Sequence, residues 1–316
     1  DVYDFRKYVS DTLAIPIHDV LRLLVRAPYT YKRYEIPKKS GGSRSIAQPA
    51  KETKIIQRLL MDAIFSQLPV HECAVAYKHG ASIKTNAQQH RYNQYLSKFD
   101  FSNFFGSITS EDIAAHLGQC LGDELSEQSV ADIARISCIR NKINSGLCLS
   151  IGAPSSPVLS NSILYNFDVS VSAWCLEKGI VYTRYADDLS FSSNQKGLSG
   201  SIEPFLRQTL KDISYPSLVL NERKTIHVSK KHQRRVTGLV ISNDGSVSLG
   251  RERKRLISAM IHRCINDKLE EADIYILQGL LGFAQDAEPI FVARMRAKYG
   301  SLVIREILRK RVKLPR

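Results

Sequence analysis

The chain has 316 residues, 43% of them hydrophobic, which is enough for one large domain or two to three subdomains with their own cores. Lys and Arg number 45 against 31 for Asp and Glu, giving a formal net charge of +14 at pH 7. This excess favours a polyanionic partner, nucleic acid first, over a merely basic soluble protein. The six cysteines lack metal-ligand spacing, which argues against a zinc site or a disulfide scaffold. No apolar run reaches membrane-spanning length, so we expect a cytoplasmic protein with no membrane partner.

Residues 1–27 carry apolar side chains at helical spacing and predict two short helices with a break near Ile15-Pro16. Residues 31–46 then predict a β-hairpin whose tip, Lys-Lys-Ser-Gly-Gly-Ser, is flexible and basic. Lys38, Lys39 and Arg44 could hold a triphosphate there through charge-assisted hydrogen bonds. A charged tip that serves solubility alone remains the alternative.

A helix is expected over residues 51–65, followed by polar, loop-like segments at residues 77–80 and 86–90. A single histidine such as His90 is more often a hydrogen-bonded structural residue than a ligand.

An apolar run at residues 95–99 predicts a strand that ends at Asp100. This carboxylate either ends a strand in the ordinary way or supplies one ligand to a metal site shared with another strand. Helices are expected over 109–142. A Gly/Pro/Ser-rich loop at residues 149–161 precedes a helix at 160–174, and Gly152 would allow the backbone to approach a ligand closely.

Residues 181–193 read Val-Tyr-Thr-Arg-Tyr-Ala-Asp-Asp-Leu-Ser-Phe-Ser-Ser and predict a β-hairpin with Asp187 and Asp188 at its turn. Two adjacent carboxylates repel each other unless a cation lies between them, and Mg²⁺ is the candidate because it prefers oxygen ligands. A solvated turn is the simpler alternative.

The last third begins with an amphipathic helix at 202–213 and a basic stretch at 230–235. Residues 236–241 and 247–249 predict a second hairpin. Residues 251–315 are helical and basic, which indicates either a nucleic-acid face or a solvated charged face.

Taken in this order, the motifs resemble those of the bacterial reverse transcriptases of retrons, over residues 29–299. The resemblance implies an α+β fold shaped as a right hand, with fingers, a ferredoxin-like palm and a helical thumb. We expect fingers with N-terminal helices at 1–95, the palm at 96–235, and a primer grip with a basic thumb at 236–316.

The resemblance also implies the site. Asp100, Asp187 and Asp188 would bind two Mg²⁺ ions together with the backbone carbonyl of Phe101, and Mn²⁺ would be a substitute. Asp188 would be the weaker ligand of the three. Lys224 would protonate the leaving pyrophosphate. The nucleotide would be bound by Lys38 or Lys39, between which the hairpin does not decide, with Arg44, Gly152 and Phe105, whose ring would exclude a ribose 2′-hydroxyl.

Two segments are similar to those typical of retrons, Asn-Ala-x-x-His at Asn86–His90 and Val-Thr-Gly at Val236–Gly238. The resemblance implies that Asn86, His90, Val236, Thr237 and Gly238 contact RNA or primer. The thumb would add Arg251, Arg253, Lys254 and Arg255. The chain departs from many relatives at Ile151, where they carry glutamine, and at Asn103, where an acidic residue is common.

The implied function is the copying of a cognate structured non-coding RNA into branched, RNA-linked single-stranded DNA (msDNA) from deoxynucleotides, in anti-phage defence. An effector protein encoded nearby and a host RNase H would be further partners. The alternatives are a reverse transcriptase of a diversity-generating or abortive-infection type, and an RNA/DNA-binding scaffold with weak catalysis.

Overall fold

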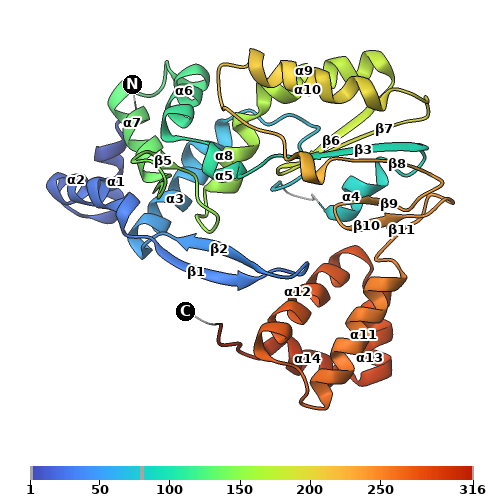
Figure 1. The fold of residues 1–316 in the computed structure, drawn as a ribbon. Helices are drawn as coiled ribbons and strands as arrows, with labels where there is room; N and C mark the ends of the chain where they lie inside the picture. The colour runs from blue at the N-terminus through green and yellow to red at the C-terminus, as the bar shows by residue number, and fades with distance from the viewer. Residues whose placement is uncertain (1–2, 79–81, 315–316) are drawn as a thin grey trace.

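Four antiparallel strands in the order β6-β7-β3-β8 form the central sheet of the protein, which a computed structural model describes over residues 3–78 and 82–314 (Figure 1). The strands are β3 (Tyr95–Asp100), β6 (Val181–Tyr185), β7 (Asp188–Ser193) and β8 (Ile226–Ser229). The strand ending at Asp100 and the hairpin around the Asp pair are thus confirmed. The sequence pattern does not predict β8, a short edge strand of mixed polarity.

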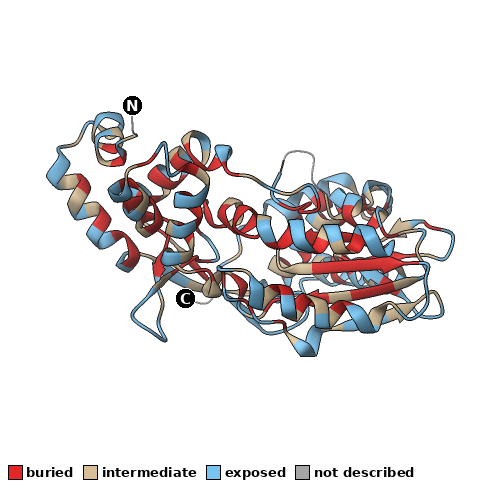
Figure 2. Cartoon of the chain, turned by 90° about the horizontal axis from the view of Figure 1, so that it is seen from above, coloured by how far each residue is buried: buried red, intermediate tan, exposed pale blue. Residues whose placement is uncertain are grey.

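Alternation along the strands gives the sheet two different faces. Phe99, Phe191 and Tyr182 point to one face, where the Phe99 and Phe191 rings meet edge to face at 5.6 Å and Tyr182 stacks on Phe191 at 4.8 Å. Helices α9 (Tyr165–Lys178) and α10 (Ser199–Asp212) cover this face (Figure 1). Lys98 and Asp100 alternate with these rings and therefore project from the opposite face. Seen from above, most of the central strands are buried (Figure 2).

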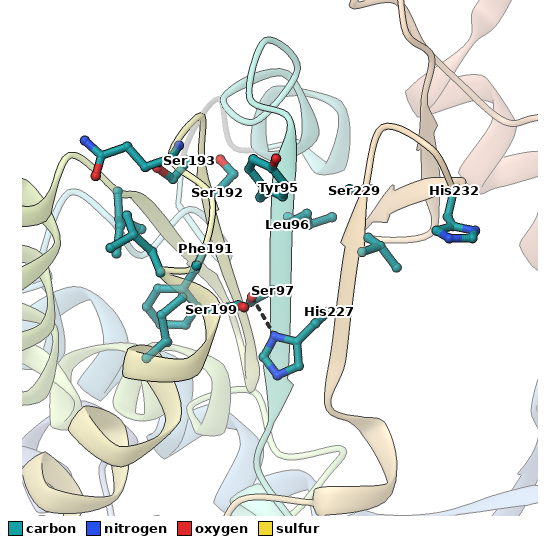
Figure 3. A pocket seen from close by; sticks show the side chains of 16 residues that line it. Tyr95, Leu96, Ser97, Phe191, Ser192, Ser193, Ser199, His227, Ser229 and His232 are labelled. Atoms are coloured by element: carbon teal, nitrogen blue, oxygen red, sulfur yellow. Dashed lines mark hydrogen bonds between the residues drawn. The ribbon is translucent and has the colours of Figure 1, made fainter.

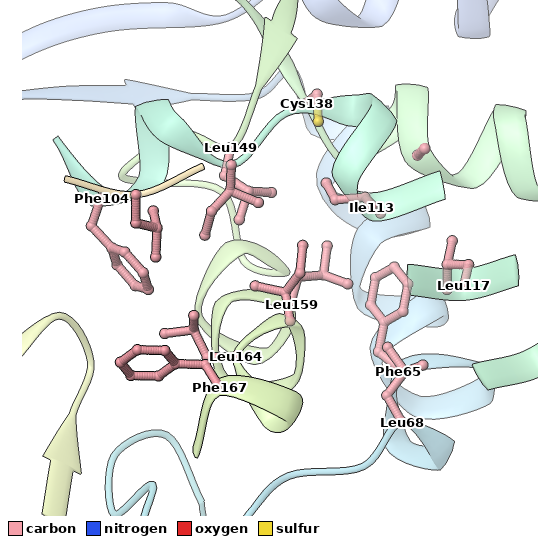
Figure 4. Packing of buried hydrophobic residues seen from close by; sticks show 14 of the residues in the cluster. Phe65, Leu68, Phe104, Ile113, Leu117, Cys138, Leu149, Leu159, Leu164 and Phe167 are labelled. Carbon is pink, nitrogen blue, oxygen red and sulfur yellow. The ribbon is translucent and has the colours of Figure 1, made fainter. Parts of the chain in front are cut away.

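The larger apolar core continues from the face under α9 and α10 into the helices that lie beside the sheet (Figure 4). These helices are α1 (Phe5–Leu13), α2 (Ile17–Arg26), α3 (Lys51–Ala63), α5 (Phe104–Ser107), α6 (Ser110–Leu121), α7 (Glu127–Ile136) and α8 (Ser156–Ile163). The break near Pro16 and the helix after residue 51 are confirmed. Over the described residues, no helix is both long enough and apolar enough to cross a bilayer.

Two predicted helix boundaries are wrong. The helices expected up to residue 142 end at Ile136, and β4 (Ile139–Arg140) pairs instead with β5 (Leu147–Cys148). The helix expected at 160–174 begins at Ser156, because proline is tolerated in a first turn, and Leu164 interrupts it with a non-helical ψ of 8°.

The fingers hairpin consists of β1 (Lys32–Pro37) and β2 (Ser43–Gln48), paired so that Ile36 lies opposite Arg44. It extends from the N-terminal helices toward the C-terminal helices (Figure 1). Its base is attached to the loop after β5, because Ala47 N–H donates to the Ile151 carbonyl at 2.8 Å. The hairpin predicted from the sequence is confirmed.

The thumb is a second unit with a separate apolar core. Its helices are α11 (Arg251–Ile265), α12 (Glu271–Ala287), α13 (Pro289–Tyr299) and α14 (Ser301–Arg309), which confirms the helical character of this region. A small sheet of β9 (Arg234–Val236), β10 (Leu239–Ile241) and β11 (Val247–Ser248) connects it to the palm. The run 236–241 is therefore not one strand, since a turn at Thr237-Gly238 divides it.

A short helix, α4 (Ile83–Gln88), lies between the palm and the thumb. It replaces most of the loop expected at residues 86–90, with Ser82 accepting a hydrogen bond from Thr85 N–H at its start. Of the other predicted loop, His79 and Gly80 lie outside the described residues.

The division into residues 1–95, 96–235 and 236–316 stays a proposal. Helix α7 packs on α6 of the proposed palm as well as on α1, α2 and α3 of the proposed fingers, so the boundary at residue 95 does not separate two independently packed units.

A buried ion pair fixes the hairpin of the central sheet to the helix above it. Arg184 Nη2 lies 2.7 Å from Asp168 Oδ2 on α9, and both side chains are 0% exposed. Arg184 Nη1 also donates to the Ala186 carbonyl in the β6–β7 turn at 2.9 Å, and Tyr182 donates to Asp168 at 2.9 Å. Because the guanidinium reaches both helix and turn, it determines where the turn lies.

We predict that Arg184→Lys lowers the free energy of unfolding by about 3 kcal/mol or more, because lysine cannot reproduce the forked contacts and leaves Asp168 poorly compensated. Arg207→Lys is the control, since the ion pairs of Arg207 with Glu203 and Glu222 are exposed and should change stability by less than about 1 kcal/mol. Denaturant unfolding measures both. Equal small losses would contradict the role given to the buried pair.

Candidate active site

Three aspartates meet at the end of the central sheet. Asp100 and Asp188 are paired across β3 and β7, so their side chains leave the same face of the sheet. Asp187 stands in the β6–β7 turn, which is closed by Ala186 in a left-handed conformation (φ 57°) and by a hydrogen bond from Phe101 N–H to the Asp187 carbonyl at 3.2 Å. The geometry brings together the carboxylates that the sequence placed on two separate segments.

Two lysines compensate these carboxylates. Lys98 Nζ lies 3.0 Å from Asp188 Oδ2, and Lys224 Nζ lies 3.2 Å from Asp100 Oδ2. Lys224 was expected at the site and is brought there by a short 3₁₀ turn at Glu222–Lys224. Lys98 was not expected, although its position two residues before Asp100 puts it on the same face.

Burial raises the pKa of all three carboxyl groups. The effect is large at Asp187, where burial, and then the neighbouring Asp100, raise the pKa to about 6. Carboxylates held in this way are stabilised by a cation.

Carboxylate and carbonyl oxygens are the donors that hard divalent cations prefer, so the donor set fits Mg²⁺. Over the described residues, no three Asp, Glu, His or Cys side chains are arranged closely enough to hold a metal as they stand. In this arrangement Lys98 and Lys224 contact carboxylate oxygens of Asp188 and Asp100. A bound cation would replace at least the Lys224 contact.

A cavity of about 650 Å³ opens in front of these aspartates. Asp100, Asp187, Lys224 and Phe105 line it, as do the following residues of the fingers and neighbouring loops: Arg33, Arg44, Tyr77, Lys142 and Ile151. The space suits a polyanionic ligand that also has an apolar part, since cationic and aromatic side chains line it together with two carboxylates. Arg33 was not predicted, because strand alternation alone does not show which face of a hairpin turns to a site.

The two lysines at the tip of the fingers do not line this cavity. Lys38 lies in the turn of the hairpin, whereas the ammonium of Lys39 is 4.6 Å from the centre of the Phe283 ring in the thumb. Burial, and then the nearby Arg253, lower the pKa of Lys39. Of the cations expected at the nucleotide, the structure therefore brings Arg44 to the cavity.

Gly152 holds the loop of residues 149–152 against the fingers hairpin. Its φ of 121° is accessible mainly to glycine, and a Cβ there would lie 2.6 Å from the Ala47 carbonyl oxygen. The neighbouring Ser150 hydroxyl donates to this same carbonyl at 3.1 Å. Gly152 thus adjoins the cavity through Ile151, which lines it.

We predict that Gly152→Ala raises the KM for nucleotide by roughly tenfold, because a displaced loop shifts the fingers hairpin relative to the aspartates. Gly41→Ala is the matched control, since Gly41 also has a positive φ (91°) but has open space around its Cβ position. Steady-state kinetics with varied nucleotide measure the effect. A Gly41 variant that is equally impaired would mean that backbone strain, and not the Ala47 contact, matters.

The residues expected to contact RNA or primer differ in how far their side chains are available to a ligand. Asn86, His90 and Val236 are at most 1% exposed, so their side chains offer no surface to RNA. Arg253 donates to the Gly238 carbonyl at 2.8 Å, and Lys254 pairs with Glu288 at 2.8 Å. Arg251 and Arg255, by contrast, are exposed on α11.

A second pocket, of about 240 Å³, lies on the other side of the sheet between β3, β8 and α10 (Figure 3). Ser97 and His227 meet in it with a hydrogen bond of 2.7 Å. The residues that line it include no acidic or strongly basic side chain, and it therefore lacks the chemistry of the larger cavity.

Comparison with solved structures supports the architecture. A telomerase from Candida albicans, solved with a fragment of telomeric RNA, superposes with a TM-score of 0.50 at 12% identity, covering 90% of this chain and 56% of that protein. At this level of identity the likeness concerns the fold alone. Together with the arrangement of fingers, central sheet and helical thumb, it defines the fold as the right-hand type.

Sequence comparison identifies the family. The model described as "Reverse transcriptase (RNA-dependent DNA polymerase)" matches residues 36–241. The retron Ec83 reverse transcriptase of Escherichia coli is 39% identical over 93% of this chain and 94% of its own length. The retron Ec73 reverse transcriptase of the same species is 32% identical over 87% of this chain and 89% of its own length. The chain belongs to the reverse transcriptase family, among the enzymes of retrons, and is an RNA-directed DNA polymerase.

Proposed function

We propose that this enzyme copies a cognate structured non-coding RNA into branched, RNA-linked single-stranded DNA by two-metal phosphoryl transfer. The observation that carries the proposal is that Asp100 and Asp187 line the same cavity as arginines and Lys224. Two-metal transfer needs carboxylates from separate strands beside a site for a phosphate chain, and this arrangement supplies both.

Asp100 and Asp187 would hold two Mg²⁺ ions, with the backbone carbonyl of Phe101 as a further ligand. Asp188 would contribute less, because its carboxylate is paired with Lys98. When bound, the ions would lower the pKa of the primer 3′-hydroxyl and neutralise charge on the transferring phosphate. Mn²⁺, with similar ligand preferences, would substitute.

The nucleotide would lie with its triphosphate toward Arg44 and Arg33, which can each contact a phosphate through two N–H groups. Lys224, at 66% exposure, can move from Asp100 to the pyrophosphate and donate a proton as it leaves. The half-buried Phe105 ring lies at the cavity wall, where it would meet a ribose 2′-hydroxyl.

Phe105→Ala should therefore reduce the preference for deoxynucleotides over ribonucleotides by roughly tenfold or more, a loss of ~1.4 kcal/mol of discrimination. Phe105→Tyr keeps the bulk of the ring and should keep the preference. Single-nucleotide additions of dGTP and GTP to one primer give the ratio for each variant. An unchanged ratio in the alanine variant would remove Phe105 from this role.

The RNA would be bound along the basic thumb, where Arg251 and Arg255 are free to contact phosphates. A cognate RNA, its msDNA product, a host RNase H that trims it and an effector protein encoded nearby are the partners that we propose. The proposed role in anti-phage defence follows from the relationship to retrons.

The test is to express the chain with the non-coding region that adjoins its gene and to isolate the nucleic acid that co-purifies. We expect a DNase-sensitive band joined to RNA, which disappears in Asp187→Asn, since an amide weakens metal binding without changing the shape of the turn. Asp212→Asn, an exposed change on α10, is the control and should leave the band unchanged.

Other outcomes favour the other functions. RNA that co-purifies without DNA in every variant would favour a scaffold with weak catalysis. Primer extension on general templates without a branched product would favour a reverse transcriptase of a diversity-generating or abortive-infection type.

A further inference from the structure

Two segments far apart in the sequence lie together where the thumb joins the palm: Asn86–His90 around the end of α4, and Val236–Gly238 at the turn between β9 and β10. We infer that these segments form a joint that sets the position of the thumb over the palm. They act on DNA synthesis by positioning the thumb and not by touching RNA. The joint is thus a positioning element of the polymerase reaction.

On the palm side, His90 attaches α4 to the face of the sheet that carries the aspartates. One ring nitrogen lies 2.6 Å from the Ser192 hydroxyl on β7, and the other lies 2.7 Å from the Thr183 hydroxyl on β6. The ring is 1% exposed, so both of its polar atoms are already used within the protein. His90 therefore fixes α4 to two palm strands at once.

On the thumb side, the Thr237 hydroxyl donates to the Ile83 carbonyl at the start of α4, at 2.9 Å. The next carbonyl, that of Gly238, accepts from Arg253 Nη1 at 2.8 Å, and the Arg253 guanidinium lies 4.8 Å from the centre of the Phe283 ring. A continuous path of contacts thus leads from the palm sheet through α4 and this turn to helices α11 and α12.

An apolar contact accompanies the polar path. Ala87 of α4 and Val236 of β9 are 0% exposed and share one core with Leu96 of the palm strand β3. Since this core also contains residues of α11 and α12, the palm and thumb meet through α4 without a free hinge.

The conformation of Thr237 supports a specific role for its hydroxyl. Thr237 and Gly238 both have positive φ, 49° and 78°, as in the tight turns where Asn-Gly is favoured. A β-branched residue is disfavoured there, and asparagine or glycine would fit with less strain. Threonine at this position is explained by the hydrogen bond to the Ile83 carbonyl, which glycine has no side chain to make.

The position of the thumb also determines its contact with the fingers hairpin. Phe283, which Arg253 contacts, also lies 4.6 Å from the ammonium of Lys39 at the tip of the fingers hairpin. A looser joint would free the thumb from both the palm and the fingers. We expect such a protein to add one nucleotide normally but to release its primer sooner.

The test compares Thr237→Val and Thr237→Gly, which both lack a side-chain donor, with Thr237→Ser, which retains the hydroxyl. The valine variant preserves the branched shape, and the glycine variant suits a positive φ. Ser258→Ala is the control, because it removes a hydroxyl that bonds Tyr299 at 2.7 Å within the thumb. DNA synthesis on a generic primed RNA template makes the result independent of the proposed branched product.

Two measurements are made on each variant. Product length per binding event, with a trap for released enzyme, should fall roughly threefold to tenfold in Thr237→Val and Thr237→Gly, as the loss of one partly buried hydrogen bond can shift a two-state equilibrium by this factor. The palm–thumb distance is measured between two spin labels, one at the exposed position Leu176 of α9 and one at the exposed position Leu302 of α14. Cys120 and Cys264 are changed to serine so that they are not labelled. The distribution of this distance should broaden in the same two variants.

Thr237→Ser and Ser258→Ala should match the parent in both measurements. The inference is overturned if Thr237→Val and Thr237→Gly keep the parental product length and distance distribution. It is also overturned if products shorten while the distance distribution stays unchanged, because the turn would then act on synthesis without positioning the thumb. Single-nucleotide addition in each variant verifies that the folded active site is intact.

Discussion

The active site depends on one buried ion pair on the far side of the sheet. Arg184 and Asp168 are both fully buried, and the guanidinium reaches past the carboxylate to the Ala186 carbonyl in the catalytic turn. A charged pair without solvent is tolerated only when its hydrogen bonds are well satisfied, and here Asn161 and Tyr182 add to them. This requirement fixes helix, strand and turn relative to one another, and it adds to the hydrogen bond from Phe101 N–H to the Asp187 carbonyl in keeping Asp187 near Asp100.

The two faces of the sheet have different roles. The apolar face packs under α9 and α10 and gives stability, while the opposite face carries Lys98, Asp100 and Asp188. Because three partly buried carboxylates repel one another, the lysines lower the electrostatic cost of the site before a metal binds. Lys224 is the more exposed of the two, at 66% against 17% for Lys98, which suits a group that leaves its carboxylate during the reaction.

Strong local patterns account for what the sequence could predict. Alternating apolar residues around Asp100 and Tyr-Ala-Asp-Asp predicted the strands, and the order of motifs identified the right-hand fold. Contacts between segments that are far apart in the sequence could not be predicted from it. Nothing local shows that Asp168 belongs to Arg184, or that Lys39 packs on Phe283 in the thumb and not beside a triphosphate. Asn86–His90 illustrates the same limit, since its polar residues predicted a loop, whereas the structure forms the end of α4 there and buries Asn86 and His90 between two units of the fold.

The position of Lys98 at the site follows from strand alternation, because Lys98 lies two residues before Asp100 and therefore on the same face. Its partner, Asp188, could not be chosen from the sequence, since that choice depends on the register of β3 with β7.

The central claim is that Asp100 and Asp187 form the metal site while Lys98 keeps Asp188 largely apart from it. Mn²⁺ binding followed by electron paramagnetic resonance, in the presence of a deoxynucleotide, tests this most directly. The account predicts that Asp100→Asn and Asp187→Asn each weaken Mn²⁺ binding strongly, whereas Asp188→Asn retains most of it. Equal losses in all three variants, or binding that none of them changes, would contradict the account.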